Sequence, residues 1–312
     1  MHVGIEIGGT KGQLMVAEPD GTITRRFHHT VDKAAGAAGI RSWIEQTLTS
    51  LGASTPGSSV TGVGVGFGGP VDTETGQIIT SHQVSGWTGF NLADWLRERT
   101  GATRVRVEND ANTAALGEAL HGAGQGFRHV FYVTLGSGIG GGMVVDGQLY
   151  RGARPGEAEI GHLWVVPPTR DVPGQTLEQT ASGWAVDRQL RDLLPQLPAD
   201  SPLRWYMEMA AKPGGEARFL APALADGDPV AQMLIEQIGS IIALGLSHVV
   251  HLFHPDVLVL GGGLSLVGEP LRLAVETALH RFVMVAFQPP PAVRLAQLGT
   301  DVVPVGALAL LN

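Results

Sequence analysis

The apolar positions of this chain fall first into short runs broken by glycine turns and later into longer helical stretches. Near the N-terminus, three β-rich runs are separated by Gly8-Gly9-Thr10-Lys11-Gly12 and by the turn Asp20-Gly21. The same order of strand, glycine turn, strand, Asp-Gly turn and strand returns near residue 130. A repeat at this spacing predicts two similar α/β halves, each with a glycine hairpin. Two such domains facing each other across a cleft would bring both hairpins to one ligand.

The pattern predicts alternating strands and helices in the first half and mainly helices in the second. The expected strands are residues 3–7, 13–17, 23–28, 60–67, 105–107, 131–135, 141–145, 148–150 and 257–260, and the expected helices are 36–51, 92–100, 111–120, 177–196, 230–253 and 302–310, with a further helical stretch at 202–211.

Composition narrows the class of protein. A chain of 312 residues is long enough for two domains, and its net charge of −8 argues against a nucleic-acid or anionic-membrane surface. The chain has no cysteine, which excludes disulfides, thiolate zinc sites and cysteine nucleophiles and fits a reducing cytosol. The N-terminus has no signal-peptide pattern, and the apolar stretch 238–253 is shorter than a membrane span. We therefore expect a soluble cytoplasmic protein.

Two stretches match the dinucleotide pattern GxGxxG, at Gly64-Gly66-Gly69 and at Gly136-Gly138-Gly141. That motif needs a strand before it and a helix after it, so that the helix N-terminus meets the pyrophosphate. The first match runs into Pro70 and the second into another strand. The sequence therefore argues against a nicotinamide site. It also contains no GxxxxGK[ST] phosphate loop.

The hairpin at Gly8 to Lys11 has the composition of an anion site. Adjacent glycines in a turn expose backbone N–H groups, while Thr10 and Lys11 add a hydroxyl and a cation. An ordinary β-turn is the alternative. A second hairpin at Gly136-Ser137-Gly138, in the corresponding place of the other half, favours phosphate binding at both.

Three polar residues stand out as candidates, each with a structural alternative. Asp110 sits where a strand passes into a helix, a common position for site residues, but it could equally be an N-cap. His162 lies in a polar loop, where a lone histidine is usually structural. Glu178 starts a helix and could be a partner of the helix dipole. His248, His251 and His254 are spaced by three, which fits a helix face better than a metal site.

Seven motifs in order along nearly the whole chain resemble the ROK family of bacterial sugar kinases and related repressors. They are GIEIGGTK (4–11), VGFGGPVD (65–72), ENDANTAALGE (108–118), TLGSGIGGG (134–142), GEAEIGH (156–162), LEQTASG (177–183) and HPDVLVLGGGLS (254–265).

The resemblance implies an α/β fold of the hexokinase and actin type, that is, a two-domain actin-like ATPase (ribonuclease H-like) fold with a cleft between the domains. We expect a smaller domain of residues 1–117 with about 301–312, and a larger one of residues 118–300. The resemblance also implies a homodimer.

The resemblance further implies site residues for ATP, magnesium and sugar. Asp110 would be the catalytic base, and Glu6 would lie near Mg²⁺, through water. The ATP phosphates and adenosine would be held by Gly8, Gly9, Thr10, Lys11, Gly136, Ser137, Gly138, Gly140, Gly261, Gly262 and Gly263. The sugar would be bound by Gly68, Gly69, Gln83, Asn109, Asp110, Glu159, His162 and Glu178.

The chain departs from the family pattern in two places. Many members carry a cysteine-rich zinc loop after the GH motif, whereas residues 163–176 contain no cysteine here, and one histidine cannot make a tetrahedral site. We therefore expect no structural zinc. The second departure is Gln83, which stands where a sugar-binding asparagine often precedes the Gly-Trp pair.

The implied reaction is transfer of the γ-phosphoryl group of ATP to a hexose, with the 6-hydroxyl of glucose as the first expectation. N-acetylmannosamine, fructose or allose are alternative substrates, and polyphosphate is an alternative donor. A catalytically weak sugar sensor is a rival of another class. A DNA-binding repressor is disfavoured, because the first hairpin begins at residue 8 and leaves no room for a preceding helix-turn-helix segment.

Overall fold

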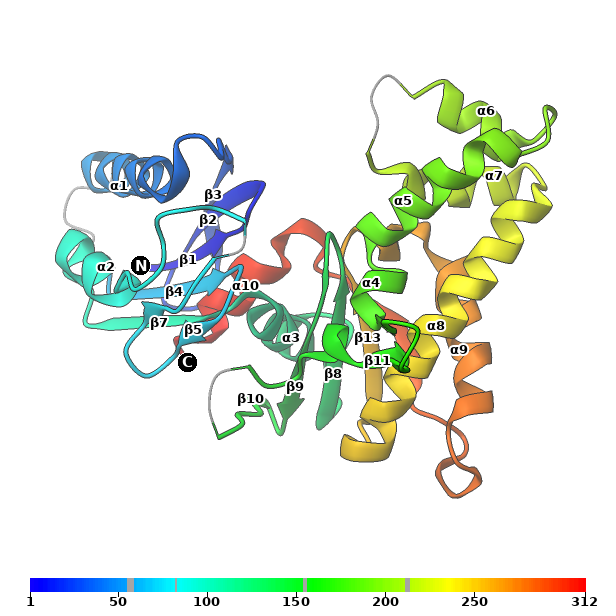
Figure 1. The fold of residues 1–312 in the computed structure, drawn as a ribbon. Helices are drawn as coiled ribbons and strands as arrows, with labels where there is room; N and C mark the ends of the chain where they lie inside the picture. Colours follow the sequence, from blue (N-terminus) through cyan, green and yellow to red (C-terminus); the bar gives the residue numbers. More distant parts are fainter. Residues whose placement is uncertain (55–58, 82, 154–155, 211–213) are drawn as a thin grey trace. The chain divides into compact units, whose positions relative to one another are not determined.

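A computed structural model describes residues 1–54, 59–81, 83–153, 156–210 and 214–312 of the chain. Two five-stranded sheets form its framework, with strand orders β3-β2-β1-β4-β7 and β10-β9-β8-β13-β14 (Figure 1). The predicted repeat is confirmed in this topology. In each sheet the first strand of a half lies in the centre, a glycine hairpin leads outward, and two parallel strands complete the other side.

Contacts within the chain divide it into two compact units. Unit 1 contains residues 1–126, 142–157 and 298–312, and unit 2 contains residues 127–141 and 158–297. The boundary at residue 141 falls inside β9 (Ile139–Val145). The domain limits expected from the resemblance, 1–117 with 301–312 and 118–300, remain a prediction about folding domains.

The first sheet has two contrasting faces because its strands alternate large apolar residues with glycines or polar residues. Val3, Ile5, Val63 and Val65 lie on the face that forms the apolar core with α1 and α2. The opposite face is covered by α3 and α10 (Figure 1).

The glycines on that opposite face allow a helix to approach the sheet closely. A Cβ at Gly64 would lie 1.7 Å from the carbonyl oxygen of Ala307 in α10, and one at Gly4 would lie 2.4 Å from that of Pro304. Gly64 and Gly66 thus serve helix packing, which agrees with the inference that they are not a dinucleotide motif.

Elements of unit 1 follow the predicted pattern closely. The first sheet contains β1 (His2–Ile7), β2 (Lys11–Ala17), β3 (Ile23–Thr30), β4 (Gly62–Phe67) and β7 (Arg104–Asn109), beside the short pair β5 (Val71–Asp72) and β6 (Gln77–Ile78). The helices are α1 (Gly36–Ser54), α2 (Leu92–Thr100), α3 (Asp110–His121) and α10 (Val302–Ala309).

Unit 2 holds most of the helical second half. Its strands are β8 (His129–Leu135), β13 (Val257–Gly261) and β14 (Ala292–Leu295), with β11 (Trp164–Val166) paired to β12 (Gln175–Thr176). Strand β10 (Gln148–Leu149) belongs to unit 1 and pairs with β9 in the second sheet. Its helices are α4 (Leu177–Ala181), α5 (Gly183–Leu193), α6 (Pro202–Glu208), α7 (Leu220–Ala225), α8 (Pro229–Phe253) and α9 (Glu269–Phe282).

Three expectations about unit 2 need correction or extension. The helix expected over 177–196 is broken, because Ser182 adopts an extended conformation and caps α5 through the N–H of Ala185. The sequence pattern does not predict helix α9 or the strands β11, β12 and β14. The stretch expected to be helical over 202–211 ends with α6 at Glu208, and its residue 211 lies outside the described residues.

Helix α8 is the one helix in the described ranges that is long and apolar enough to cross a membrane by length and composition. With 25 residues it is longer than the apolar stretch 238–253, because it begins at Pro229, directly after the cap residue Asp228. In its most apolar window 61 % is buried inside the structure, and α9 packs along it. These are the properties of a core helix.

Candidate functional site

The first glycine hairpin connects β1 to β2 in unit 1. The N–H of Gly8 donates to the carbonyl of Lys11 at 3.0 Å, which closes the turn and leaves Thr10 and Lys11 exposed. Gln83 covers Gly9, since a Cβ at Gly9 would lie 1.7 Å from Oε1 of Gln83. The structure therefore brings the predicted sugar residue Gln83 against the predicted phosphate hairpin.

Glu6, at the end of β1, is a buried carboxylate with two close partners. Oε2 lies 3.1 Å from the Lys11 ammonium and accepts a hydrogen bond of 2.7 Å from Nε2 of Gln13. Burial raises the pKa of Glu6, and the attraction of Lys11 and the Gln13 hydrogen bond offset this only in part. Because Mg²⁺ prefers oxygen ligands and retains several waters, this carboxylate fits a contact with a hydrated magnesium ion.

Asn109 and Asp110 lie at the junction where β7 passes into α3. Asn109 caps the helix, since its Oδ1 accepts from the N–H groups of Ala111 at 2.8 Å and Asn112 at 3.3 Å. The alternative of Asp110 as the N-cap is therefore wrong: Asp110 is the first helical residue, and its Oδ1 accepts from Ala111. Nδ2 of Asn109 donates to the carbonyl of Gly69 at 3.3 Å.

The parallel strands of unit 1 bring Asp110 close to the first hairpin. Residues Ile7, Phe67 and Asn109 are neighbours across β1, β4 and β7. A Cβ at Gly68 would lie 3.4 Å from Oδ2 of Asp110 and 3.6 Å from Cα of Gly8. The carboxylate of Asp110, the backbone of Gly68 and the turn at Gly8 therefore lie together at the carboxyl ends of β1, β4 and β7. Ligand sites of α/β proteins are commonly found at such strand ends.

The second hairpin, in unit 2, is held by side chains and backbone of α4 and α5. The N–H of Ile139 donates to Oε2 of Glu178 at 2.8 Å, and the N–H of Gly183 donates to the carbonyl of Gly136 at 2.7 Å. Gly138 leaves room for the Glu178 carboxylate, since a Cβ there would lie 2.4 Å from Oε2. Ser137 at the tip of the hairpin is exposed.

The remaining predicted residues of unit 2 lie near the ends of β8, β13 and α4. Gly262 has φ of 83°, and a Cβ there would lie 2.6 Å from the backbone of Leu135, so the glycine run of 261–263 passes close to the end of β8. His162 belongs to a 3₁₀ turn (Ile160–His162) that packs against α4, and its N–H donates to the carbonyl of Glu159. Glu159 and His162 are both exposed.

The segment 163–176 forms a β hairpin through the pairing of Trp164 in β11 with Thr176 in β12. In the described ranges no group of three or more His, Asp or Glu residues could hold a metal ion, and the absence of structural zinc stays a prediction.

Sequence reasoning missed one network beside Asp110, made by Glu108, Asn112, Arg151 and Glu157. Glu108 and Asn112 lie inside the quoted ENDAN motif, two residues before and two after Asp110, so the motif was a signal for them. Nothing in the sequence pairs them with Arg151 or Glu157.

Comparison with known proteins identifies the family of the chain. The model of the ROK family matches residues 2–312. The glucokinase of Thermotoga maritima is 30 % identical over 314 residues, covering 99 % of this chain and 96 % of that protein. A beta-glucoside kinase of Listeria monocytogenes is 32 % identical over 267 residues, covering 83 % of this chain and 81 % of that protein.

Solved structures give the same result for the fold. The structure of a ROK family glucokinase from Streptomyces griseus in complex with glucose and AMPPNP has a TM-score of 0.83 at 31 % identity, covering 99 % of this chain and 98 % of that one. The expected actin-like ATPase fold is thereby confirmed. On its sequence, its topology and the match along its whole length, this chain belongs to the ROK family.

Proposed function

We propose that the protein is an ATP-dependent hexose kinase that phosphorylates the 6-hydroxyl of glucose, with Asp110 as the catalytic base. The observation that carries the proposal is the position of Asp110, at the end of β7 beside Gly68 and the first glycine hairpin. Similarity to glucokinases along nearly the whole chain supports the same assignment.

The residues have distinct roles in this proposal. Asp110 accepts the proton of the attacking sugar hydroxyl, a contribution of about 10²- to 10⁴-fold for a positioned base. Asn109 binds the sugar while its own side chain is held by the cap and by Gly69. In unit 2, Glu159, His162 and Glu178 bind further hydroxyls.

The two hairpins would stabilise phosphate charge. Their glycines allow phosphate oxygens to approach the backbone N–H groups, and Lys11 adds a cation. When bound, Mg²⁺ would neutralise charge on the transferred phosphate. Glu6 would orient water around the metal ion, and Gly261, Gly262 and Gly263 would lie beside the adenosine.

The experiment is a coupled ADP-release assay with magnesium across a panel of hexoses, N-acetylhexosamines and β-glucosides. ATP and polyphosphate are compared as donors, and Asp110→Asn is measured alongside. We expect glucose turnover with ATP that falls at least about 10²-fold in the variant. The matched control is Asp72→Asn, a half-buried aspartate of β5 whose carboxylate accepts hydrogen bonds from residues of its own turn, Glu74 and Thr75.

Turnover on another sugar would keep the kinase and change its substrate. Binding of a hexose by calorimetry without any phosphorylated product would instead support a sugar sensor. A homodimer, expected from the resemblance alone, is tested by light scattering on the purified chain.

A further inference from the structure

Glu108 is a buried carboxylate directly before the proposed catalytic junction. Its residue is 2 % exposed, and it lies on the face of β7 that is covered by α3 and α10. Oε1 accepts from the N–H of Asn109 at 2.9 Å and from Nδ2 of Asn112 at 3.3 Å. Glu108 therefore bonds to the residues on both sides of Asp110.

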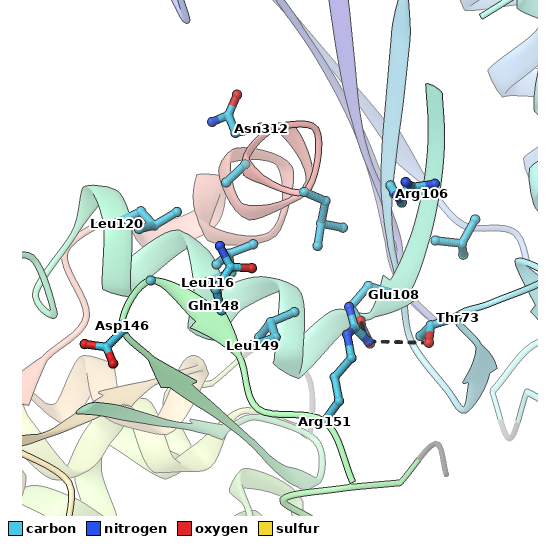
Figure 2. Close-up of a pocket in the computed structure, with 14 residues that line it drawn as sticks. Thr73, Arg106, Glu108, Leu116, Leu120, Asp146, Gln148, Leu149, Arg151 and Asn312 are labelled. Atoms are coloured by element: carbon cyan, nitrogen blue, oxygen red, sulfur yellow. Dashed lines mark hydrogen bonds and ion pairs between the residues drawn. The ribbon is translucent and has the colours of Figure 1, made fainter. Parts of the chain in front are cut away.

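Glu108 lines a pocket of about 430 Å³ in unit 1 (Figure 2), and its other oxygen is buried. Among the described residues Oε2 accepts no hydrogen bond, and its ion pair is with Nη1 of Arg151 at 2.7 Å. Arg151 extends into the pocket from the segment after β10, and Nη1 also lies 3.4 Å from the hydroxyl of Thr73. Because a buried charge without a partner is strongly unfavourable, Arg151 holds the Glu108 carboxylate in place.

Asn112 extends the network toward the loop that carries other predicted sugar residues. Its Nδ2 donates to Oε1 of Glu157 at 2.9 Å as well as to Glu108. The Asn112 amide thus links the carboxylate of Glu108 to that of Glu157, which lies two residues before Glu159 in the sequence.

We propose that Glu108, held by Arg151, is a positioning residue for Asp110. The inference rests on the proposed kinase function. Glu108 fixes the N–H of Asn109 and the amide of Asn112, and Asn109 in turn caps α3, so the first turn that carries Asp110 is oriented from both sides. A displacement of about 1 Å at a reacting group can cost about 10²-fold in rate, so loss of this restraint is visible in kcat.

The first test replaces Arg151 by methionine, which keeps most of the side-chain volume and removes the charge. Arg151 is half exposed, so the variant is expected to fold. The control is Arg106→Met, since Arg106 lines the same pocket as Arg151 and lies in β7 with Glu108, and its one hydrogen bond in the described residues is to the carbonyl of Val105. We expect kcat to fall about 10- to 100-fold in Arg151→Met with the KM for sugar within about twofold of the wild type, and no change in the control.

A double-mutant cycle with Glu108→Gln makes the test specific. If Arg151 acts through Glu108, Arg151→Met adds little to the loss of kcat already caused by Glu108→Gln. Additive losses, an unchanged kcat, or an effect on KM alone would each overturn the inference.

Hydrogen exchange of peptides covering residues 107–113 supplies a readout that needs no turnover. We expect faster exchange there in Arg151→Met and Glu108→Gln but not in Arg106→Met. Unchanged exchange would overturn the inference even if no sugar proved to be a substrate, whereas a wild-type enzyme without turnover would overturn only the proposed function.

Discussion

The carboxylate of Glu178 accepts a hydrogen bond from the N–H of Ile139 at 2.8 Å, in space that exists because residue 138 is a glycine. Helix α4 is thereby bonded to the second glycine hairpin. Glu178, a predicted sugar-binding residue, thus directly contacts the turn that is predicted to bind phosphate. This connection gives the first of four predictions.

Gly138→Ala should lower kcat/KM about 10-fold or more and destabilise the protein by about 1–3 kcal/mol. The new methyl group would displace the Glu178 carboxylate and break a hydrogen bond to a charged acceptor, which accounts for that magnitude. For the loss of stability the matched control is Gly136→Ala in the same turn, where the nearest atom to a Cβ is 3.9 Å away. Equal stability of the two variants would contradict the prediction. Kinetics and urea unfolding provide the measurements.

Gly64→Ala should destabilise the chain by about 3 kcal/mol or more, because the methyl group would meet the backbone of α10 and force strand and helix apart. Gly52→Ala is the control. Gly52 lies in helix α1 with nothing within 4 Å of a Cβ, so this change should stabilise by about 0.5–1 kcal/mol. Chemical denaturation of both variants measures the contrast, and a tolerated Gly64→Ala would show that α10 does not pack against β4 as described.

Glu6 should make stability depend on pH in the direction opposite to most carboxylates. Burial raises its pKa in the folded state, so its contribution is fully present below the unfolded pKa of about 4.3 and is lost as pH rises through the folded value. Glu6→Gln removes this titration. We expect the variant to gain stability relative to wild type between acidic and neutral pH while losing magnesium-dependent turnover. Unfolding free energies measured from pH 4 to 8 test this, and a constant difference between the two proteins would refute it.

Asp228 should contribute stability that is lost as the pH falls, as is usual for a carboxylate with a lowered pKa. Burial raises its pKa, but hydrogen bonds from the Ser201 hydroxyl and from N–H groups including that of Leu203 outweigh burial and hold the pKa below its ordinary value. Its contribution is therefore present above the unfolded pKa of about 3.9 and is lost as pH falls through the folded value.

At neutral pH, Asp228→Asn should cost about 2 kcal/mol, because this 1 % exposed carboxylate also caps α8 through Val230 and Ala231. Asp226→Asn is the control, since Asp226 is exposed and bonds to the Tyr206 hydroxyl. A loss in Asp228→Asn that does not shrink on acidification would argue against a charged cap. Thermal unfolding at several pH values distinguishes these outcomes.

The sequence by itself determined the elements whose signals are local. Glycine turns beside apolar runs predicted the repeat and both hairpins, and the strand-to-helix change at residues 109–110 predicted the position of Asp110. Such features depend on neighbouring residues, since the alternation of apolar and polar residues, the composition of turns and the helical period each involve only a few consecutive positions.

Only the tertiary structure decided which distant groups meet. The pairing of Glu108 with Arg151 spans 43 residues, and Glu178 reaches Ile139 across 39. The break at Ser182 likewise depends on its place beside the second hairpin, where Gly183 donates to Gly136. No local pattern encodes these contacts. In an isolated segment each polar group would bond to water, and only burial and packing in the folded chain decide which protein group replaces that water.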